Sequence, residues 1–240
     1  MKKILILLAM WVAVVSTTFA QLYTPRSSSV TAFGPRTEEW AASKIASENA
    51  LAQQQYPNAT FVSTSTTKYN CHSYAWNSTS TSNNYWVNDP SPYWLDGSYT
   101  FVATSTNAQK WYYANGGDHS ANTYSGVTFQ SKWGKWPVMR HAWNYCPYTY
   151  STMWGFEFCP TSSSSCKAPS SFWVSSTTSS SIKLSYTRAC NAAQYQLQYQ
   201  PTGNTNWYVL TTFNAPTGQY LTLTNTVTCP ANSCYKFRVK

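Results

Sequence analysis

The chain has 240 residues, enough for one mid-sized domain and a smaller second one. Aromatic residues make up 17% and charged residues only 10%, which argues against disorder and suits an exported, mostly β protein. The net charge is +9, but there is no run of Lys and Arg to follow a nucleic-acid backbone, so we expect no nucleic-acid partner.

The first 20 residues predict a secretory signal peptide. Lys2 and Lys3 precede an apolar stretch at residues 4–15, and small residues follow as far as Ala20. Basic, apolar and small residues in this order are typical of a segment that is removed on export. The apolar stretch is also shorter than the roughly 20 residues that span a bilayer. We therefore expect a secreted or cell-surface protein, cleaved near Ala20 and without a membrane span.

A helix is the next predicted element. Thr37 can cap it, Pro57 stops it, and Trp40, Ile45 and Leu51 would form its apolar face.

Short elements follow in the predicted first domain. A buried helix is expected at residues 71–76, directly after a polar loop. Strands are expected at residues 99–102, 119–124, 127–133 and 138–142, with glycine-containing turns between the last three. The strands at 119–124 and 127–133 are expected to form a hairpin.

A Ser-rich linker is predicted at residues 159–168, between a first domain at 21–158 and a second at 169–240. Strand-like alternation recurs through the second domain, at residues 181–186, 194–199, 207–210, 220–224 and 235–239. Short strands at this spacing predict an all-β antiparallel sandwich.

The second domain resembles a fibronectin type III domain, which has an immunoglobulin-like sandwich fold. The Trp207 strand, the strand with Leu221 and Leu223, and the final strand at 235–239 lie where that family has its core. The family has a further strand at this point, so we expect the last strand to be missing.

Cys71 and His119 are the candidate catalytic pair. Cys71 is expected at a helix start, where free backbone N–H groups and the helix dipole favour a thiolate. His119 is expected at the start of a strand, where it can face such a thiol and act as general base and then acid. His141 is the preferred third group to orient the imidazole, with Asp118 and Ser131 as alternatives.

Other residues are candidates for binding the substrate. The backbone N–H of Cys71 and a loop donor, Asn70 or Tyr69, are predicted to stabilise an oxyanion. The candidates for a substrate cleft are Trp76, Trp86 and Trp94, together with Tyr85 and Tyr93. The same aromatic residues would equally suit a hydrophobic core.

Three segments carry a resemblance to a known group of enzymes. They are Asn-Cys-His-Ser-Tyr-Ala-Trp at 70–76, Gly-Asp-His-Ser-Ala at 117–121, and Ser-Lys-Trp-Gly at 131–134 with Arg-His at 140–141. They resemble the papain-like cysteine peptidases and amidases of the NlpC and CHAP kind, and uncharacterised secreted bacterial proteins with the same pattern. The resemblance covers residues 37–148.

This resemblance implies an α+β papain-like fold, with a helix packed on an antiparallel sheet, followed by the immunoglobulin-like sandwich. It also implies a peptidase or amidase, with the cysteine at a helix start, the histidine at a strand start and a third polar residue on the next strand.

Cys71 has a second interpretation as half of a disulfide, which is common in exported proteins. The other six cysteines all lie from Cys146 onward. Three pairs would use them and leave Cys71 free, namely Cys159–Cys166, Cys229–Cys234 and Cys146–Cys190.

The histidines also have other interpretations. His119 would then be a satisfied structural residue and His141 part of a polar rim, while His72 is expected to be structural because it points elsewhere on the helix. A metal site formed by Cys71 and these three histidines lacks the usual ligand spacing, so we expect no metal or cofactor.

The sequence therefore predicts a secreted cysteine hydrolase that cleaves an amide bond in a peptide, with cell-wall peptidoglycan as a candidate substrate. The alternative is a non-catalytic surface or adhesion protein that binds glycan or protein through an aromatic-rich face.

Overall fold

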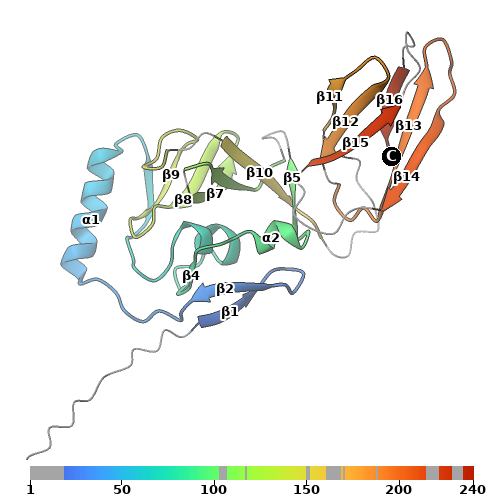
Figure 1. Cartoon of the computed structure of the whole chain (residues 1–240). Coiled ribbons are helices and arrows are strands. Elements are labelled where there is room, and N and C mark those ends of the chain that lie inside the picture. The colour runs from blue at the N-terminus through green and yellow to red at the C-terminus, as the bar shows by residue number, and fades with distance from the viewer. Residues whose placement is uncertain are drawn as a thin grey trace, which may run out of the picture.

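The structure is a computed structural model. It describes residues 19–102, 107–116, 118–149, 152–160, 169, 171–187, 189–214, 222–228 and 235–240. Strands dominate this part of the chain and form one seven-stranded sheet and three sheets of three strands (Figure 1). The helices are α1 (Ala42–Gln55), η1 (Ser73–Asn77), which is a π-helical turn, and α2 (Pro92–Leu95).

The seven-stranded sheet forms the centre of the first part of the chain. Its strand order is β3-β9-β8-β7-β6-β10-β5, and neighbouring strands are antiparallel. The strands are β3 (Thr60–Ser63), β5 (Tyr99–Val102), β6 (Lys110–Ala114), β7 (His119–Ser125), β8 (Thr128–Lys132), β9 (Val138–Ala142) and β10 (Thr152–Phe158).

The turn between β6 and β7 sets the position of His119. Asn115, Gly116 and Asp118 have φ values of 56°, 112° and 35°, so the chain reverses through left-handed conformations that Gly, Asn and Asp tolerate best. The reversal places His119 opposite Tyr113 in the ladder. The turn predicted at this point is therefore present.

The predicted hairpin is also present. Strands β7 and β8 pair with Asn122 opposite Gln130, and Gly126 lies between them with a φ of 52°. Side chains alternate between the two faces of a strand, so only every second residue of β7 faces the helices.

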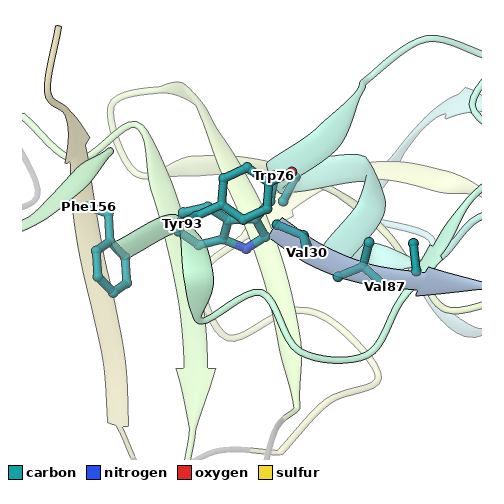
Figure 2. Close-up of a cluster of buried hydrophobic side chains, with 7 residues drawn as sticks. Val30, Trp76, Val87, Tyr93 and Phe156 are labelled. Carbon is teal, nitrogen blue, oxygen red and sulfur yellow. The ribbon is translucent and has the colours of Figure 1, made fainter. Parts of the chain in front are cut away.

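A small sheet packs against the helical segments η1 and α2. It contains β1 (Phe19–Tyr23), β2 (Ser29–Phe33) and β4 (Trp86–Val87). A buried cluster joins this sheet to η1, α2 and β10 (Figure 2), and its members are Val30, Ala32, Ala75, Trp76, Val87, Tyr93 and Phe156. Trp76 and Tyr93 lie side by side there, with 5.7 Å between their ring centroids.

The predicted signal peptide lies largely outside the described residues, which begin at Phe19. The predicted cleavage point near Ala20 falls within β1. Within the described part of the chain, no helix is both long enough and apolar enough to cross a membrane.

The second part of the chain contains two three-stranded sheets, with strand orders β11-β12-β15 and β14-β13-β16. The strands are β11 (Phe172–Thr177), β12 (Ser181–Thr187), β13 (Gln194–Pro201), β14 (Tyr208–Asn214), β15 (Thr222–Thr228) and β16 (Tyr235–Val239). Leu184 of β12, Leu197 of β13 and Val227 of β15 share one buried cluster, so the two sheets pack against each other. The strands predicted at 181–186, 194–199 and 235–239 are found in these sheets.

The predicted fold class, an α+β papain-like fold followed by an immunoglobulin-like sandwich, is wrong. The structure consists mostly of antiparallel sheets and shows no papain-like packing of a helix on a sheet. α1 begins at Ala42 rather than Thr37 and buries only Ala52, because Ser, Asn and Gln interrupt its apolar face. The helical turn after Cys71 ends at Asn77, since the Ser, Thr and Asn residues that follow compete for backbone hydrogen bonds.

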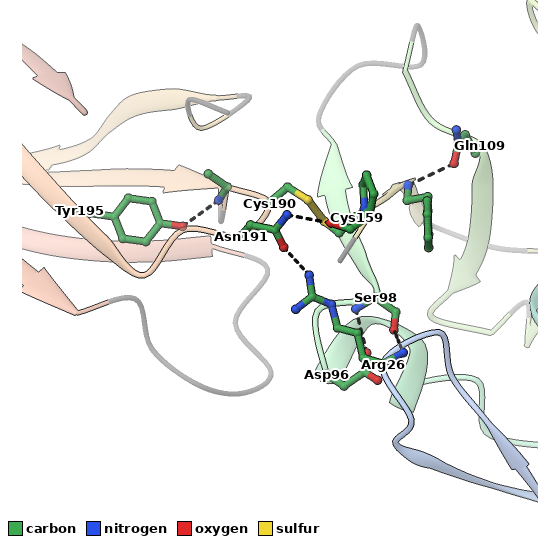
Figure 3. The surroundings of a disulfide bond; sticks show 11 residues. Arg26, Asp96, Ser98, Gln109, Cys159, Cys190, Asn191 and Tyr195 are labelled. Carbon is green, nitrogen blue, oxygen red and sulfur yellow. Dashed lines mark hydrogen bonds between the residues drawn. A yellow bond between two sulfur atoms is a disulfide. The ribbon is translucent and has the colours of Figure 1, made fainter. Parts of the chain in front are cut away.

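A disulfide joins Cys159, after β10, to Cys190, after β12, across 5.6 Å between their Cα atoms (Figure 3). The predicted pairs Cys159–Cys166 and Cys146–Cys190 are therefore wrong, and Cys146 is a free thiol. The pair Cys229–Cys234 lies outside the described residues.

Polar contacts reinforce the junction at the disulfide. The Arg26 guanidinium donates to Asn191 Oδ1, and Asn191 Nδ2 donates to the Pro160 carbonyl across 2.8 Å. The backbone on both sides of the Ser-rich segment is thus held together by covalent and hydrogen bonds.

Candidate active site

Asn70 fixes the start of the helical turn that carries Cys71. Its Oδ1 accepts the backbone N–H of Ser73 at 3.1 Å and of Val87 at 3.2 Å, and its Nδ2 donates to the Val87 carbonyl at 2.6 Å. The Asn70 carbonyl accepts the N–H of Tyr74, so the turn begins at Cys71, as predicted. Because the Asn70 amide is engaged by this capping, it is not free to hold an oxyanion.

Tyr69, the other candidate oxyanion donor, lies in the core. It is 2% exposed, and its ring stacks on Tyr74 at 6.2 Å.

Backbone amides surround the free, buried thiol of Cys71. Hydrogen bonds from the N–H groups of Ser120, His72 and Cys71 itself favour the thiolate, but burial outweighs them and raises the pKa of Cys71 to about 12. The thiol is therefore protonated, and Sγ lies 4.0 Å from the Asp118 carbonyl oxygen. The surrounding N–H groups would stabilise a Cys71 thiolate, but burial keeps the sulfur protonated.

The imidazole of His119 is completely buried between two tyrosines. Tyr148 stacks on it with 3.8 Å between ring centroids, and Tyr113 meets it edge-on at 4.9 Å. Burial first, then the nearby His141 and His72, lowers the pKa of His119 well below 6.5. Neither ring nitrogen has a hydrogen-bond partner among the described residues. Buried polar atoms without partners are rare and call for an explanation.

Cys71 lies at the start of β7, where its sulfur is beside the backbone of Asp118 and Ser120, on either side of His119. No hydrogen bond joins the thiol to the imidazole. Ser120 points toward η1, because Trp76 Nε1 donates to its Oγ across 2.9 Å. By strand alternation, His119 points to the other face of the sheet, so the predicted thiol–imidazole contact is not made.

Tyr148 lies close to both Cys71 and His119. Burial first, then the negative charges of Cys71, Cys146 and Asp118, raises the pKa of the Tyr148 phenol. Sequence reasoning did not identify Tyr148, since nothing in its neighbourhood marks it apart from other tyrosines.

His72, expected to be structural, links the helical turn to both neighbours of His119. Its Nε2 lies 3.0 Å from Asp118 Oδ1, and its Nδ1 lies 2.8 Å from Ser120 Oγ. His72 is 2% exposed, whereas the Asp118 side chain is 81% exposed. These contacts hold Cys71 in position relative to His119. The sequence signal for this link was the presence of polar residues, Asp118 and Ser120, on both sides of His119.

His141 has partners other than His119. Its Nδ1 lies 2.8 Å from the Ala142 carbonyl, and its Nε2 lies 2.7 Å from Ser131 Oγ. Since Nδ1 donates to the carbonyl, Nε2 accepts from the Ser131 hydroxyl, which also accepts from Trp133 Nε1. The orienting role predicted for His141 therefore has no support, and the same applies to Ser131.

Lys132 is a further buried polar residue that sequence reasoning missed. Its Nζ donates to the carbonyls of Gly134 at 2.8 Å, Thr66 at 3.3 Å and Trp136. Burial lowers its pKa to about 7. It ties β8 to the turn that follows it.

The three tryptophans predicted to line a cleft have different environments. Trp76 lies in the core, and Trp86 faces the guanidinium of Arg36 at 5.5 Å. Trp94 lines a cavity of about 400 Å³. We call this cavity the aromatic groove; its lining residues are Asp89, Ser91, Trp94, Leu95, Tyr112, Ala114, Asn115 and Trp154.

Among the residues with described positions, no three His, Cys, Asp or Glu side chains are grouped to hold a metal ion. Comparisons of the chain with protein-family models, curated proteins and solved structures found no match.

Proposed function

We propose that the protein is a secreted cysteine hydrolase that cleaves an amide bond in a peptide, with Cys71 as the nucleophile and His119 as the general base. One observation carries the proposal. A free thiol lies among three backbone N–H groups beside the start of β7, and His119 on that strand has an imidazole with both nitrogens unengaged. Free nitrogens on a buried histidine cost stability, which is typical of functional sites.

The chemistry follows from these groups. His119 takes the proton from Cys71 Sγ, and the sulfur attacks the carbonyl carbon of the substrate amide. The backbone N–H of Cys71 stabilises the oxyanion. The C–N bond then breaks, the amine leaves with the proton from His119, and a water molecule hydrolyses the thioester to release the acid and the thiol.

Substrate entry requires Tyr148 to leave its place on His119. The start of β7 must also rearrange so that the imidazole reaches Sγ. Once hydrated, the imidazole has a pKa that returns toward 6.5, where a general base works at neutral pH. Hydration also lowers the pKa of Cys71. The proposed enzyme is therefore closed in this structure and becomes active on opening.

Cell-wall peptide is the proposed substrate source. The predicted export favours work at an anionic surface, as does the net charge of +9, which becomes +7 (9 − 2) once Lys2 and Lys3 are removed with the signal peptide.

The second candidate is a non-catalytic surface protein. The burial of both Cys71 and His119 favours it, because an inert core thiol would have the same raised pKa.

Alkylation of the thiols separates the two candidates. The full chain is treated with iodoacetamide between pH 5 and 9, and the labelling rates of Cys71 and Cys146 are followed by mass spectrometry. Cys146 is the internal control because it is also a free thiol. The rates are compared in wild type, His119→Gln and His141→Gln.

For a hydrolase, we expect the labelling rate of Cys71 to have an inflection near the pKa of a histidine, because the imidazole takes the thiol proton whenever the site opens. His119→Gln removes this inflection and His141→Gln does not. If the labelling rate of Cys71 has the same pH dependence in wild type and His119→Gln, the hydrolase is excluded.

A further inference from the structure

The aromatic groove is built from rings that touch one another. The ring centroids of Trp94 and Tyr112 are 5.4 Å apart, and those of Tyr112 and Trp154 are 5.9 Å apart. All three side chains are partly exposed. Aromatic rings carry negative charge on their faces, so a set of partly exposed rings attracts cations and apolar groups.

The groove is acidic although the protein is basic. The chain has 16 Lys and Arg against 7 Asp and Glu, yet the charged residue among those that line the groove is Asp89. The Asp89 carboxylate accepts the backbone N–H of Ser91 at 2.9 Å and is exposed. A carboxylate beside aromatic rings is complementary to an ammonium group.

Tyr112 connects the groove to the Cys71 site. Its ring lies 5.9 Å from the His72 ring. Burial first, then the negative charges of Asp118, Asp89 and Cys71, raises the pKa of the Tyr112 phenol. Tyr112 therefore lies between the groove and His72, the residue that follows Cys71.

From this geometry we infer that the aromatic groove binds a primary ammonium group of the substrate peptide, as in a lysine-type side chain, between Asp89 and the rings of Trp94, Tyr112 and Trp154. The role as a substrate subsite rests on the proposed hydrolase function, whereas binding itself does not. The groove selects substrates with an amine close to the bond that Cys71 attacks.

Binding is tested with the full chain carrying Cys71→Ser, so that no turnover occurs. Two blocked tripeptides, Ala-Lys-Ala and Ala-norleucine-Ala, are titrated by calorimetry at low and high salt. They differ only in the ammonium group. Asp89→Asn removes the groove charge, and Glu38→Gln is the matched control because Glu38 is exposed and lies outside the groove.

We expect the lysine peptide to bind about tenfold more tightly than the norleucine peptide, less so at high salt. Asp89→Asn should remove most of this difference, and Glu38→Gln none of it. Equal affinities for the two peptides would overturn the inference, as would an equal effect of the two variants. Tighter binding of a neutral oligosaccharide than of the lysine peptide would also overturn it, by identifying the rings as a sugar site.

The two proposals fail separately. Binding of the lysine peptide is measured on a variant that lacks the thiol. Labelling of the thiol is measured with no peptide in the groove. An inert Cys71 with a functional groove would thus remove the hydrolase and leave the ammonium site.

Discussion

Tyr148 lies flat on the imidazole of His119, with only 10° between the two ring planes. The contact excludes water from His119, whose pKa falls because the charged form loses its hydration. Tyr148 also lies near the Cys71 thiol, so one side chain borders both proposed reacting groups.

Replacing Tyr148 by alanine should open the site. We expect Tyr148→Ala to raise the alkylation rate of Cys71 at pH 7 by about tenfold, which corresponds to removing roughly 1.4 kcal/mol of opening cost. Tyr148→Phe keeps the stacked ring and should label at the wild-type rate. The measurement is the rate of iodoacetamide labelling, with Cys146 as reference in each protein. Equal rates in Tyr148→Ala and wild type would show that Tyr148 does not close the site.

His141 should make the protein less stable in acid. Its pKa is about 4 when folded, because burial opposes the charge, and about 6.5 when unfolded. The unfolded chain binds the proton first, so stability is complete above pH 6.5 and falls as the pH drops toward 4. The loss amounts to about 3 kcal/mol over this window.

The check is urea unfolding of wild type and His141→Gln at pH 7 and pH 4.5. Glutamine stays neutral and can accept the Ser131 hydrogen bond, so the variant should lose less stability in acid. His119 is present in both proteins, and its contribution cancels in the comparison. An identical loss in both proteins would contradict the pKa assigned to His141.

Asp118 should act in the same sense as His141, but at lower pH. The hydrogen bond to His72 lowers its pKa below the ordinary 3.8. The folded-state pKa is depressed, so its contribution is present above pH 3.8 and is lost as the pH falls through the folded pKa. Because the side chain is largely exposed, we expect less than about 1 kcal/mol.

Unfolding of wild type and Asp118→Asn at pH 6 and pH 3 measures this contribution. The stability difference between the two proteins should shrink at pH 3. A difference that grows in acid would show that the His72 contact does not favour the ionised carboxylate.

The disulfide between Cys159 and Cys190 should stabilise the junction. The two residues are 31 positions apart, and closing such a loop in the unfolded chain contributes about 3–4 kcal/mol in the chain-entropy model. We expect the double variant Cys159→Ser/Cys190→Ser to unfold at lower urea than wild type. Cys146→Ser removes a free thiol and should leave the midpoint nearly unchanged. Equal midpoints for the double variant and wild type would show that the junction needs no covalent link.

Local residue patterns predicted several elements. The glycine at 116 indicated the turn before His119, and alternation indicated β7, β8, β12 and β13. The polar loop before Cys71 indicated a helix start, and the structure shows that Asn70 caps it, because its short polar side chain accepts an exposed N–H group. These signals act within a few residues, so the chain alone reveals them.

Relationships between distant segments were not predictable in the same way. The phase of β7, which turns Ser120 rather than His119 toward η1, depends on packing across the whole sheet. The pairing of Cys159 with Cys190 depends on where β10 and β12 end in space. The motif residues around Cys71 were therefore located in sequence, but their contacts required the fold.

The disulfide also sets a path for mechanical load. A pull on the C-terminal strands reaches Cys190 and passes through the sulfur atoms to Cys159, at the end of β10. Strands β11 and β12 lie between the two cysteines in sequence and so carry none of this tension along their backbone. A protein attached to a surface through its last strands would transmit force directly into the seven-stranded sheet through β10, whose Trp154 lines the groove.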